Sequence, residues 1–192
     1  MEVEEFYRKH DGVFFSYVCF RKEFALDFLA EAIRCFRAEF PKTGFLLVGP
    51  WDREMDAMKT FLAEQKIEDA VCLLASVPHD LFLTLLSRSL AYIRTPVTDG
   101  ICSSVLESLK LKVPVLAAEN STRPAGAALW KEGDLESLLG LMKDTVNNHA
   151  AMVAAIPEIE LEDNAKKLAD SIERVSLKEQ AARDVREASV RT

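Results

Sequence analysis

LAYIRTPVTDGICSSVLESLKLKVPVLAA, residues 90–118, contains the pattern that decides the fold. It begins with a short apolar run, LAYIRT, and ends with another, VPVLAA. Between these runs, SSVLESLKL places its apolar residues at helical spacing. Strands that are buried on both faces read as nearly continuous apolar runs, and a helix between two such strands is typical of parallel pairing. The stretch therefore predicts a strand, a helix and a second strand parallel to the first.

The same unit recurs three times upstream. Each apolar run is followed by a segment whose apolar residues recur every three or four positions. The predicted strands lie at 13–20, 45–49 and 71–75, and the helices after them lie at 24–40, at 53–65 and from Pro78 onward. The chain is therefore predicted to be a doubly wound α/β protein with a mostly parallel sheet and further helices at its C-terminus.

The pattern changes toward both ends of the chain. Residues 1–12 form a short lead-in, residues 13–146 contain the strand and helix units, and residues 147–192 become rich in charge with a sparse apolar stripe. We therefore expect one Rossmann-like domain over 13–146 and a C-terminal helical extension over 147–192.

Composition disfavours several classes of protein. The 192 residues carry a net charge of −7 without a Lys/Arg-rich run, so neither nucleic acid nor an anionic membrane is the expected partner. The four cysteines have no CxxC spacing and the three histidines lie far apart, which favours reduced thiols and no metal site. No apolar run approaches the roughly 20 residues that a membrane span needs. We expect a cytoplasmic chain without an integral membrane segment.

The predicted fold indicates where a ligand would bind. In open parallel sheets, ligands lie beyond the carboxyl ends of the strands and close to helix N-termini, which favour anions. Four loops lie at that edge, residues 19–24, 49–53, 75–79 and 95–104. The last of them leads into the helix expected from SSVLESLKL, whose first N–H groups would attract an anion.

An ordered set of motifs resembles a known family. A strand ending in Val-Gly, a V-x-L-L-x-x-V loop, the Asp99-Gly100 pair leading to V-L-E, then V-P-V-x-A and a Gly-Asp pair before a helix follow one another. In this order they are similar to the C-terminal, donor-binding half of the GT-B enzymes called glycosyl transferase group 1. The similarity covers roughly residues 13–145.

The resemblance implies an activity and a substrate. Such enzymes bind a nucleotide diphosphate sugar in this half and transfer the sugar, with retained configuration, to an acceptor in the other half. Their signature is a Glu, seven residues and a second Glu, and here Asp99 and Glu107 stand at those two positions. The resemblance implies that Asp99 and Gly100 contact the donor sugar and that Glu107 accepts hydrogen bonds from the ribose.

It also implies roles for backbone groups. The phosphates would be cradled by N–H groups of Cys102, Ser103 and Ser104, and the base by the loop that contains Ser76 and Val77. No metal cofactor is expected. The partner would be an N-terminal acceptor-binding domain or subunit, through which any peripheral membrane association would occur. The chain alone, as an excised domain or a natural half, is not expected to catalyse transfer.

Several positions depart from the family pattern. The family's first loop has a Gly-Arg pair and then a Lys-Gly pair, where this chain has Cys-Phe at 19–20 and Phe-Ala at 24–25. Arg21 and Lys22 lie nearby and are candidate phosphate ligands. Lys112 stands where a small Gly is usual. These changes motivate an alternative, a degenerate and non-catalytic GT-B-like module for binding or scaffolding.

The candidate site residues also have purely structural interpretations. Ser104 and Glu107 have the spacing of a helix capping box. Asp99 and Gly100 are an ordinary turn pair. Asp134, after a glycine, is expected to be the N-cap of the following helix.

Overall fold

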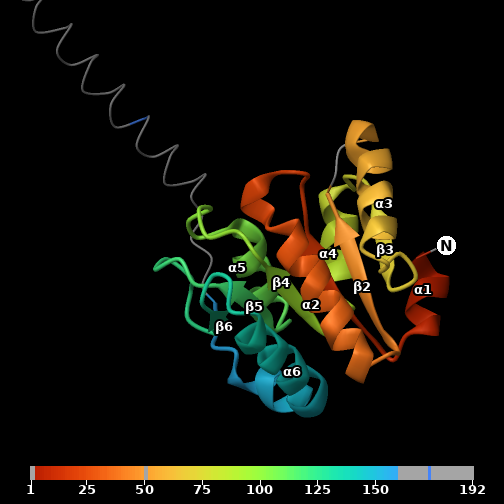
Figure 1. Cartoon of the computed structure of the whole chain (residues 1–192). Helices are drawn as coiled ribbons and strands as arrows, with labels where there is room; N and C mark the ends of the chain where they lie inside the picture. The colour runs from red at the N-terminus through yellow and green to blue at the C-terminus, as the bar shows by residue number, and fades with distance from the viewer. Residues whose placement is uncertain (1–2, 50–51, 160–172, 174–192) are drawn as a thin grey trace, which may run out of the picture. The chain divides into compact units, whose positions relative to one another are not determined.

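A computed structural model describes residues 3–49, 52–159 and 173. Its centre is a six-stranded sheet in which all neighbouring strands are parallel, in the order β3-β2-β1-β4-β5-β6 (Figure 1). The strands are β1 (Gly12–Tyr17), β2 (Thr43–Val48), β3 (Val71–Leu74), β4 (Ala91–Arg94), β5 (Val115–Ala118) and β6 (Ala127–Trp130). The α-helices are α1 (Val3–Lys9), α2 (Leu26–Glu39), α3 (Met55–Glu64), α4 (His79–Ser87), α5 (Ser103–Lys110) and α6 (Leu135–Ala155), and the 3-10 helices are η1 (Lys22–Phe24) and η2 (Asp52–Glu54).

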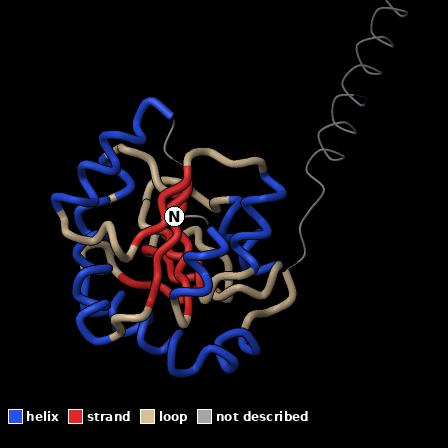
Figure 2. Tube along the Cα trace, turned by 90° about the vertical axis from the view of Figure 1, so that its right-hand side faces the viewer, coloured by secondary structure: helices blue, strands red, loops and turns tan. Residues whose placement is uncertain are grey.

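Helices cover both faces of the sheet. Successive side chains of a strand point to opposite faces, so Phe14 and Phe15 of β1 enter different cores. Phe14 packs with residues of α2, α3 and α6, whereas Phe15 packs with residues of α1, α4 and α5. Figure 2 shows the strands in red enclosed by blue helices. The prediction of a doubly wound α/β fold is confirmed.

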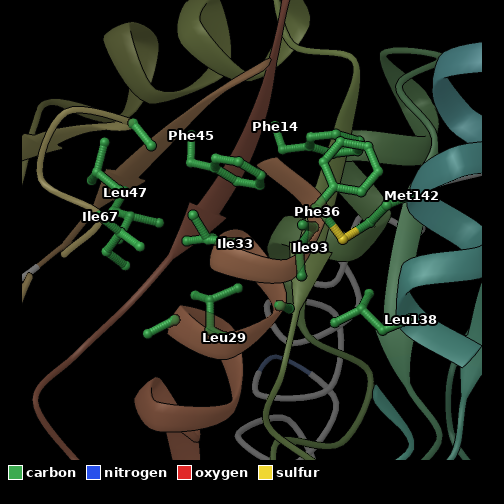
Figure 3. Close-up of a cluster of buried hydrophobic side chains, with 14 of the residues drawn as sticks. Phe14, Leu29, Ile33, Phe36, Phe45, Leu47, Ile67, Ile93, Leu138 and Met142 are labelled. Atoms are coloured by element: carbon green, nitrogen blue, oxygen red, sulfur yellow. The ribbon is translucent and has the colours of Figure 1, made fainter. Parts of the chain in front are cut away.

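The core on the α2 face holds α2 against the sheet. Phe14 stacks on Phe45 of β2 and meets Phe36 of α2 edge-on, with ring centroids 5.6 Å apart in both pairs (Figure 3). Leu29 and Ile33 lie on the same buried face of α2. Each such side chain contributes roughly 1.5–3 kcal/mol by leaving water. This packing positions α2 on the sheet, and with it the end of the loop that follows β1.

The middle of the sheet is its topological switch point. β1 and β4 are neighbours, β2 and β3 continue the sheet on one side, and β5 and β6 continue it on the other. The chain after β1 therefore passes to one face of the sheet and the chain after β4 to the other. In open parallel sheets this reversal opens a crevice at the carboxyl ends of the strands.

Two elements were not predicted. β6 is a short edge strand with the sequence AALW, of which only Trp130 is buried. α1 lies in the segment interpreted as a lead-in, and its Phe6 is buried in the core beside β1. Acidic residues in its first turn and basic residues in its last turn suit the helix dipole.

The expected division between residues 146 and 147 lies inside α6. The helix continues to Ala155, and Asn148 has non-helical backbone angles of φ −128° and ψ 26°. The compact unit that contains the sheet ends at Ile159. The rest of the predicted extension, 160–172 and 174–192, lies outside the described residues, so the domain division stays a prediction. Within the described chain, no helix combines the length and apolarity needed to cross a bilayer.

Candidate functional site

A cavity of about 360 Å³ lies at the crevice. Its walls come from the end of β1, the loop between β3 and α4, the first turn of α4, the end of β4 and the N-terminal part of α5. The lining residues are Tyr17, Val77, His79, Phe82, Arg94, Cys102, Ser103, Ser104 and Glu107. The structure thus brings together five of the residues predicted from sequence, from segments far apart in the chain.

The other predicted site residues lie elsewhere. Ser76 is exposed on the loop beside Val77. Asp99 and Gly100 are not among the described residues that line the cavity. Lys22 lines a hollow of about 420 Å³ between α2 and the loop after β6. It also lies with Arg21 at a hollow of about 330 Å³ against α3. Both cations are exposed, and the structure does not bring them to the cavity at α5.

The N-terminus of α5 differs from the expected capping box. Cys102 is the N-cap, and no side chain of the described residues caps the helix. Ser104 Oγ instead lies 2.8 Å from the hydroxyl of Tyr92 and 3.1 Å from Sγ of Cys102. Glu107 turns toward α4. The capping-box interpretation is therefore wrong. Since the N–H groups of Val105 and Leu106 donate to the carbonyl of Cys102, those of Ser103 and Ser104 remain for a ligand or for water.

Glu107 bridges two helices at the edge of the cavity. Its Oε1 lies 3.0 Å from Nε2 of His79, at the start of α4. The Glu107 side chain is 24% exposed and that of His79 is 67% exposed, so the carboxylate is reachable from the cavity. An exposed pair of this kind contributes roughly 0–1 kcal/mol. Sequence reasoning missed His79, although its position directly after Pro78 in the expected base loop was a usable signal.

Asp99 is held by two arginines. Its Oδ2 accepts a 2.7 Å hydrogen bond from Nε of Arg94, and its Oδ1 lies 2.9 Å from Nη2 of Arg123. Burial raises the pKa of Asp99, but the hydrogen bond from Arg94 and the charges of both arginines outweigh it and hold the pKa below its ordinary value. Both carboxylate oxygens are therefore engaged, and the role in sugar binding stays a prediction.

Arg123 fastens the loop between β4 and α5 to the end of β5. Its side chain is 1% exposed. Besides contacting Asp99, it donates to the carbonyls of Pro96, Ala118 and Gly100. Three peptide carbonyls and a carboxylate thus share one guanidinium, whose fork of five donors suits such a set. The loop is consequently pre-ordered by a residue that lies outside every motif noted in the sequence.

Arg94 is the last residue of β4 and lines the cavity. Its side chain is 7% exposed, and its Cζ lies 5.2 Å from the centroid of the Phe24 ring and 5.9 Å from that of Tyr17. Its Nη1 is buried and has no hydrogen-bond acceptor among the described residues. Sequence reasoning missed it, although a single arginine in the otherwise apolar run LAYIRT was visible.

Two positions where the family pattern has Gly keep a left-handed backbone. Ala25 has φ 46° and Lys112 has φ 58°. L-residues other than Gly adopt this conformation at a cost of roughly 1–2 kcal/mol. Nζ of Lys112 donates to the carbonyls of Ile156 and Pro157, which ties the segment after α6 to the end of α5. The two departures from Gly have therefore kept the backbone shape that Gly would favour.

The sheet order and the crevice define a Rossmann-like domain. The model of the glycosyl transferases group 1 family matches residues 4–191, and the chain belongs to this family. It is 26% identical over 148 residues to "Glycosyltransferase 1 domain-containing protein 1" of Xenopus tropicalis, which covers 75% of this chain and 41% of that protein. The chain thus spans about two fifths of the length of this relative.

Solved structures share the fold at low identity. One is α,α-trehalose 6-phosphate synthase from Burkholderia multivorans, with a TM-score of 0.68 and 14% identity over 81% of this chain and 39% of that one. Another is Anabaena Alr3699/HepE in complex with UDP, with a TM-score of 0.63 and 16% identity over 82% and 48%. A third is the pneumococcal O-GlcNAc transferase GtfA in complex with UDP and GlcNAc, with a TM-score of 0.61 and 15% identity over 76% and 31%. The resemblance stated from sequence is confirmed.

Proposed function

We propose that this chain is the donor-binding half of a retaining glycosyltransferase, and that its cavity binds a nucleotide diphosphate sugar. The observation that carries the proposal is the convergence of Glu107, the N-terminus of α5 and the loop at Val77 on one cavity at the switch point. Its volume of about 360 Å³ lies within the roughly 300–1,000 Å³ of small-molecule sites. Family membership supports a sugar transfer as the reaction.

Each part of the cavity has a task in this proposal. The diphosphate lies at the N-terminus of α5, where N–H groups and the helix dipole favour the negative charge that grows on the leaving group. Glu107 accepts hydrogen bonds from the ribose hydroxyls, and its contact with His79 keeps the carboxylate near the cavity. The loop with Ser76 and Val77 binds the base, and the loop at Asp99 and Gly100 faces the donor sugar.

A second protein half completes the enzyme in this proposal. Because the match covers only 41% of the Xenopus relative, an N-terminal acceptor-binding domain or subunit is the proposed partner. The chain alone binds the donor without transferring the sugar. A cytoplasmic location is part of the proposal, and it is supported by four cysteines that are all free thiols.

The test is a thermal-shift titration of this chain with UDP, GDP, ADP and UDP-sugars, beside Glu107→Ala. A ligand at 100 times its dissociation constant adds about 2.7 kcal/mol to the free energy of unfolding. We expect one base to raise the melting temperature of the unaltered chain, and Glu107→Ala to lose most of that shift. Because the pair with His79 is exposed, the variant itself should lose no more than about 1 kcal/mol of stability.

The matched control is Glu64→Ala, an exposed glutamate at the end of α3. It removes the same charge far along the chain from the cavity and should leave the ligand shift intact. If a nucleotide stabilises the unaltered chain and Glu107→Ala equally, the role of Glu107 is wrong. If no nucleotide or nucleotide sugar shifts the unaltered chain, the donor-binding proposal itself fails.

A non-catalytic binding or scaffold module is the second candidate. It is favoured by the positions of Arg21 and Lys22, which line other hollows, and by the two arginines that engage Asp99. A donor site needs positive charge at its diphosphate, and the first loop does not bring any to this cavity. The same titration separates the two candidates, because a scaffold module predicts no nucleotide-dependent shift.

A further inference from the structure

The cluster at the end of β4 carries more positive than negative charge. Arg94 and Arg123 are 7% and 1% exposed, and they share the single carboxylate of Asp99. Tyr92, which is fully buried beside them, does not balance the charge, because burial raises its pKa and keeps it protonated. Among the described residues, one positive charge in this buried cluster is therefore left without a counter-charge.

The surplus charge falls on Arg94. The guanidinium of Arg123 is occupied by Asp99 and three peptide carbonyls. Arg94 donates through Nε to Asp99, whereas its buried Nη1 has no acceptor in the described part of the chain. A buried donor without an acceptor is costly, and more so on a charged group. Arg94 is thus the member of the cluster whose charge is not matched within the described chain, and it lines the cavity.

Arg94 and the N-terminus of α5 border the same cavity. Ser103 and Ser104 are the first two residues of this eight-residue helix, and their N–H groups precede the intrahelical hydrogen bonds. An anion in the cavity would therefore meet two independent sources of positive potential, the helix dipole and a buried guanidinium. Glu107, the carboxylate that also lines the cavity, belongs to a later turn of α5.

The aromatic ring of Phe24 suits a positive charge at Arg94, the last residue of β4. The family pattern has a lysine at this position, but here an aromatic ring is buried 5.2 Å from Cζ of Arg94. A lysine in its place would bring a second cation against Arg94, whereas an aromatic face attracts the guanidinium. Phe24, at the position where the family has a lysine, therefore leaves room for a buried guanidinium at Arg94 without repulsion between two cations.

We propose that Arg94, positioned by Asp99, supplies the positive charge that binds the diphosphate of the donor, in place of the cations that the loop after β1 lacks. This inference rests on the proposed function, since it names the residue that meets the diphosphate. Arg21 and Lys22, the candidates from sequence, have no part in it. Asp99 is then a positioning residue whose carboxylate aligns the guanidinium.

The experiment compares two variants of the full chain that remove positive charge. Arg94→Gln removes the buried guanidinium, and the control Arg21→Gln/Lys22→Gln removes both exposed cations of the first loop. Calorimetric titrations use UDP, GDP and ADP, their nucleosides and inorganic pyrophosphate. One charge-assisted contact corresponds to roughly 10- to 100-fold in affinity. We expect Arg94→Gln to weaken the diphosphate and pyrophosphate by that factor while nucleoside affinity stays unchanged, and the double control to change neither by more than about threefold.

The outcomes separate this inference from the proposed function. If a nucleoside diphosphate binds and Arg94→Gln leaves its affinity unchanged, the role of Arg94 is overturned and donor binding stands. If pyrophosphate binds through Arg94 and no nucleotide does, Arg94 is confirmed as an anion ligand and donor binding fails. If neither probe binds the unaltered chain, both are overturned.

A second measurement does not depend on the variant folding. Arginine Nε–H resonances of the unaltered chain, assigned through the backbone, are followed by NMR during a pyrophosphate titration. We expect the Arg94 resonance to shift with the same dissociation constant as the binding isotherm, while those of Arg21 and of Arg34, an exposed residue of α2, stay in place. Binding of pyrophosphate with an unmoved Arg94 resonance would overturn the assignment.

Discussion

The two loops at the switch point treat positive charge in opposite ways. In the loop after β1, Arg21 and Lys22 are exposed. The loop after β4 is held by Arg123, which lies beyond β5 and is 1% exposed. Arg123 joins Asp99 to carbonyls of this loop and to the carbonyl of Ala118 at the end of β5. The first loop presents its cations to water, whereas the second uses buried arginines to set its own shape.

The difference shows why a charged residue near a site is weak evidence of a role. An exposed cation is screened by water and loses side-chain entropy when it binds. A buried guanidinium acts in a medium of lower dielectric constant and is already oriented, so its attraction for an anion is stronger. The burial and orientation of each cation near the crevice therefore indicate a role in anion binding better than the number of cations does.

Removal of Arg123 should give the largest effect. Arg123→Met keeps much of the side-chain length but removes the buried donor to the carbonyls of Pro96 and Ala118 and the charge beside Asp99. The Gly100 carbonyl keeps its 2.9 Å hydrogen bond from Nδ2 of Asn120. We expect a loss of about 3–5 kcal/mol in the free energy of unfolding, measured by urea denaturation. Arg21→Met is the matched control, and as an exposed substitution it should change stability by no more than about 0.5 kcal/mol. Equal losses in the two variants would contradict the contrast between the loops.

Asp99→Asn should give an intermediate effect that depends on pH. At pH 7 we expect a loss of about 1.5–3 kcal/mol, because the arginines lose the ionic hydrogen bonds to the carboxylate. The pKa of Asp99 is lowered from an unfolded value near 3.8, so its contribution to stability is complete above that value. It disappears as the pH falls through the lower folded pKa.

Urea denaturation of the unaltered chain and Asp99→Asn between pH 7 and pH 2.5 checks this expectation. The stability difference between the two proteins should shrink only in the acid part of the range. A constant difference would mean that the ionised carboxylate does not stabilise the fold through Arg94 and Arg123.

Ligand binding by the same variant tests the other role of Asp99. If Asp99→Asn binds UDP normally but loses discrimination for UDP-sugars, the result would support the sugar contact implied by the family resemblance.

Ala25→Gly should give the smallest effect and the opposite sign. Ala25 adopts a left-handed conformation with φ 46°, so glycine relieves strain there while it adds entropy to the unfolded chain. The net expectation is a gain of about 0.5–1 kcal/mol. Ala57→Gly, on an exposed position of α3, is the control and should lose up to about 1 kcal/mol. Thermal and urea denaturation of both variants measure the two signs, and a loss at both positions would contradict the strain at Ala25.

Most of the fold was predictable because buried strands and helices need apolar residues at regular spacings in the sequence. β1 to β5 are apolar runs, and α2 to α5 carry apolar residues at helical spacing, so period and length identify them. Asp134 was correctly predicted as an N-cap, since its carboxylate accepts the N–H of Ser137 at 3.0 Å. β6 was missed although its four residues, AALW, are all apolar, because two of them are alanines, which are uncommon in strands.

The candidate site was predictable only for residues in or directly before the two helices that begin at the crevice, α4 and α5. Val77, Cys102, Ser103, Ser104 and Glu107 line one cavity as the motif order implied. The capping box failed because Glu107 contacts His79, 28 residues away in sequence, rather than its own helix start. Local spacing describes only the bonds that neighbouring residues can make, and the competing partner came from another helix.

From the order of its residues alone, this chain shows its doubly wound sheet, its place among the group 1 glycosyl transferases and the helix start that lies at the crevice. These follow from apolar period and motif order, which act over a few residues at a time. The tertiary structure decides which charges reach the crevice. Arg94 and Arg123 converge on Asp99 from the end of β4 and from beyond β5, and Phe24 covers Arg94 from the loop after β1. Burial and pairing across such distances depend on how the elements pack, and no local pattern encodes them.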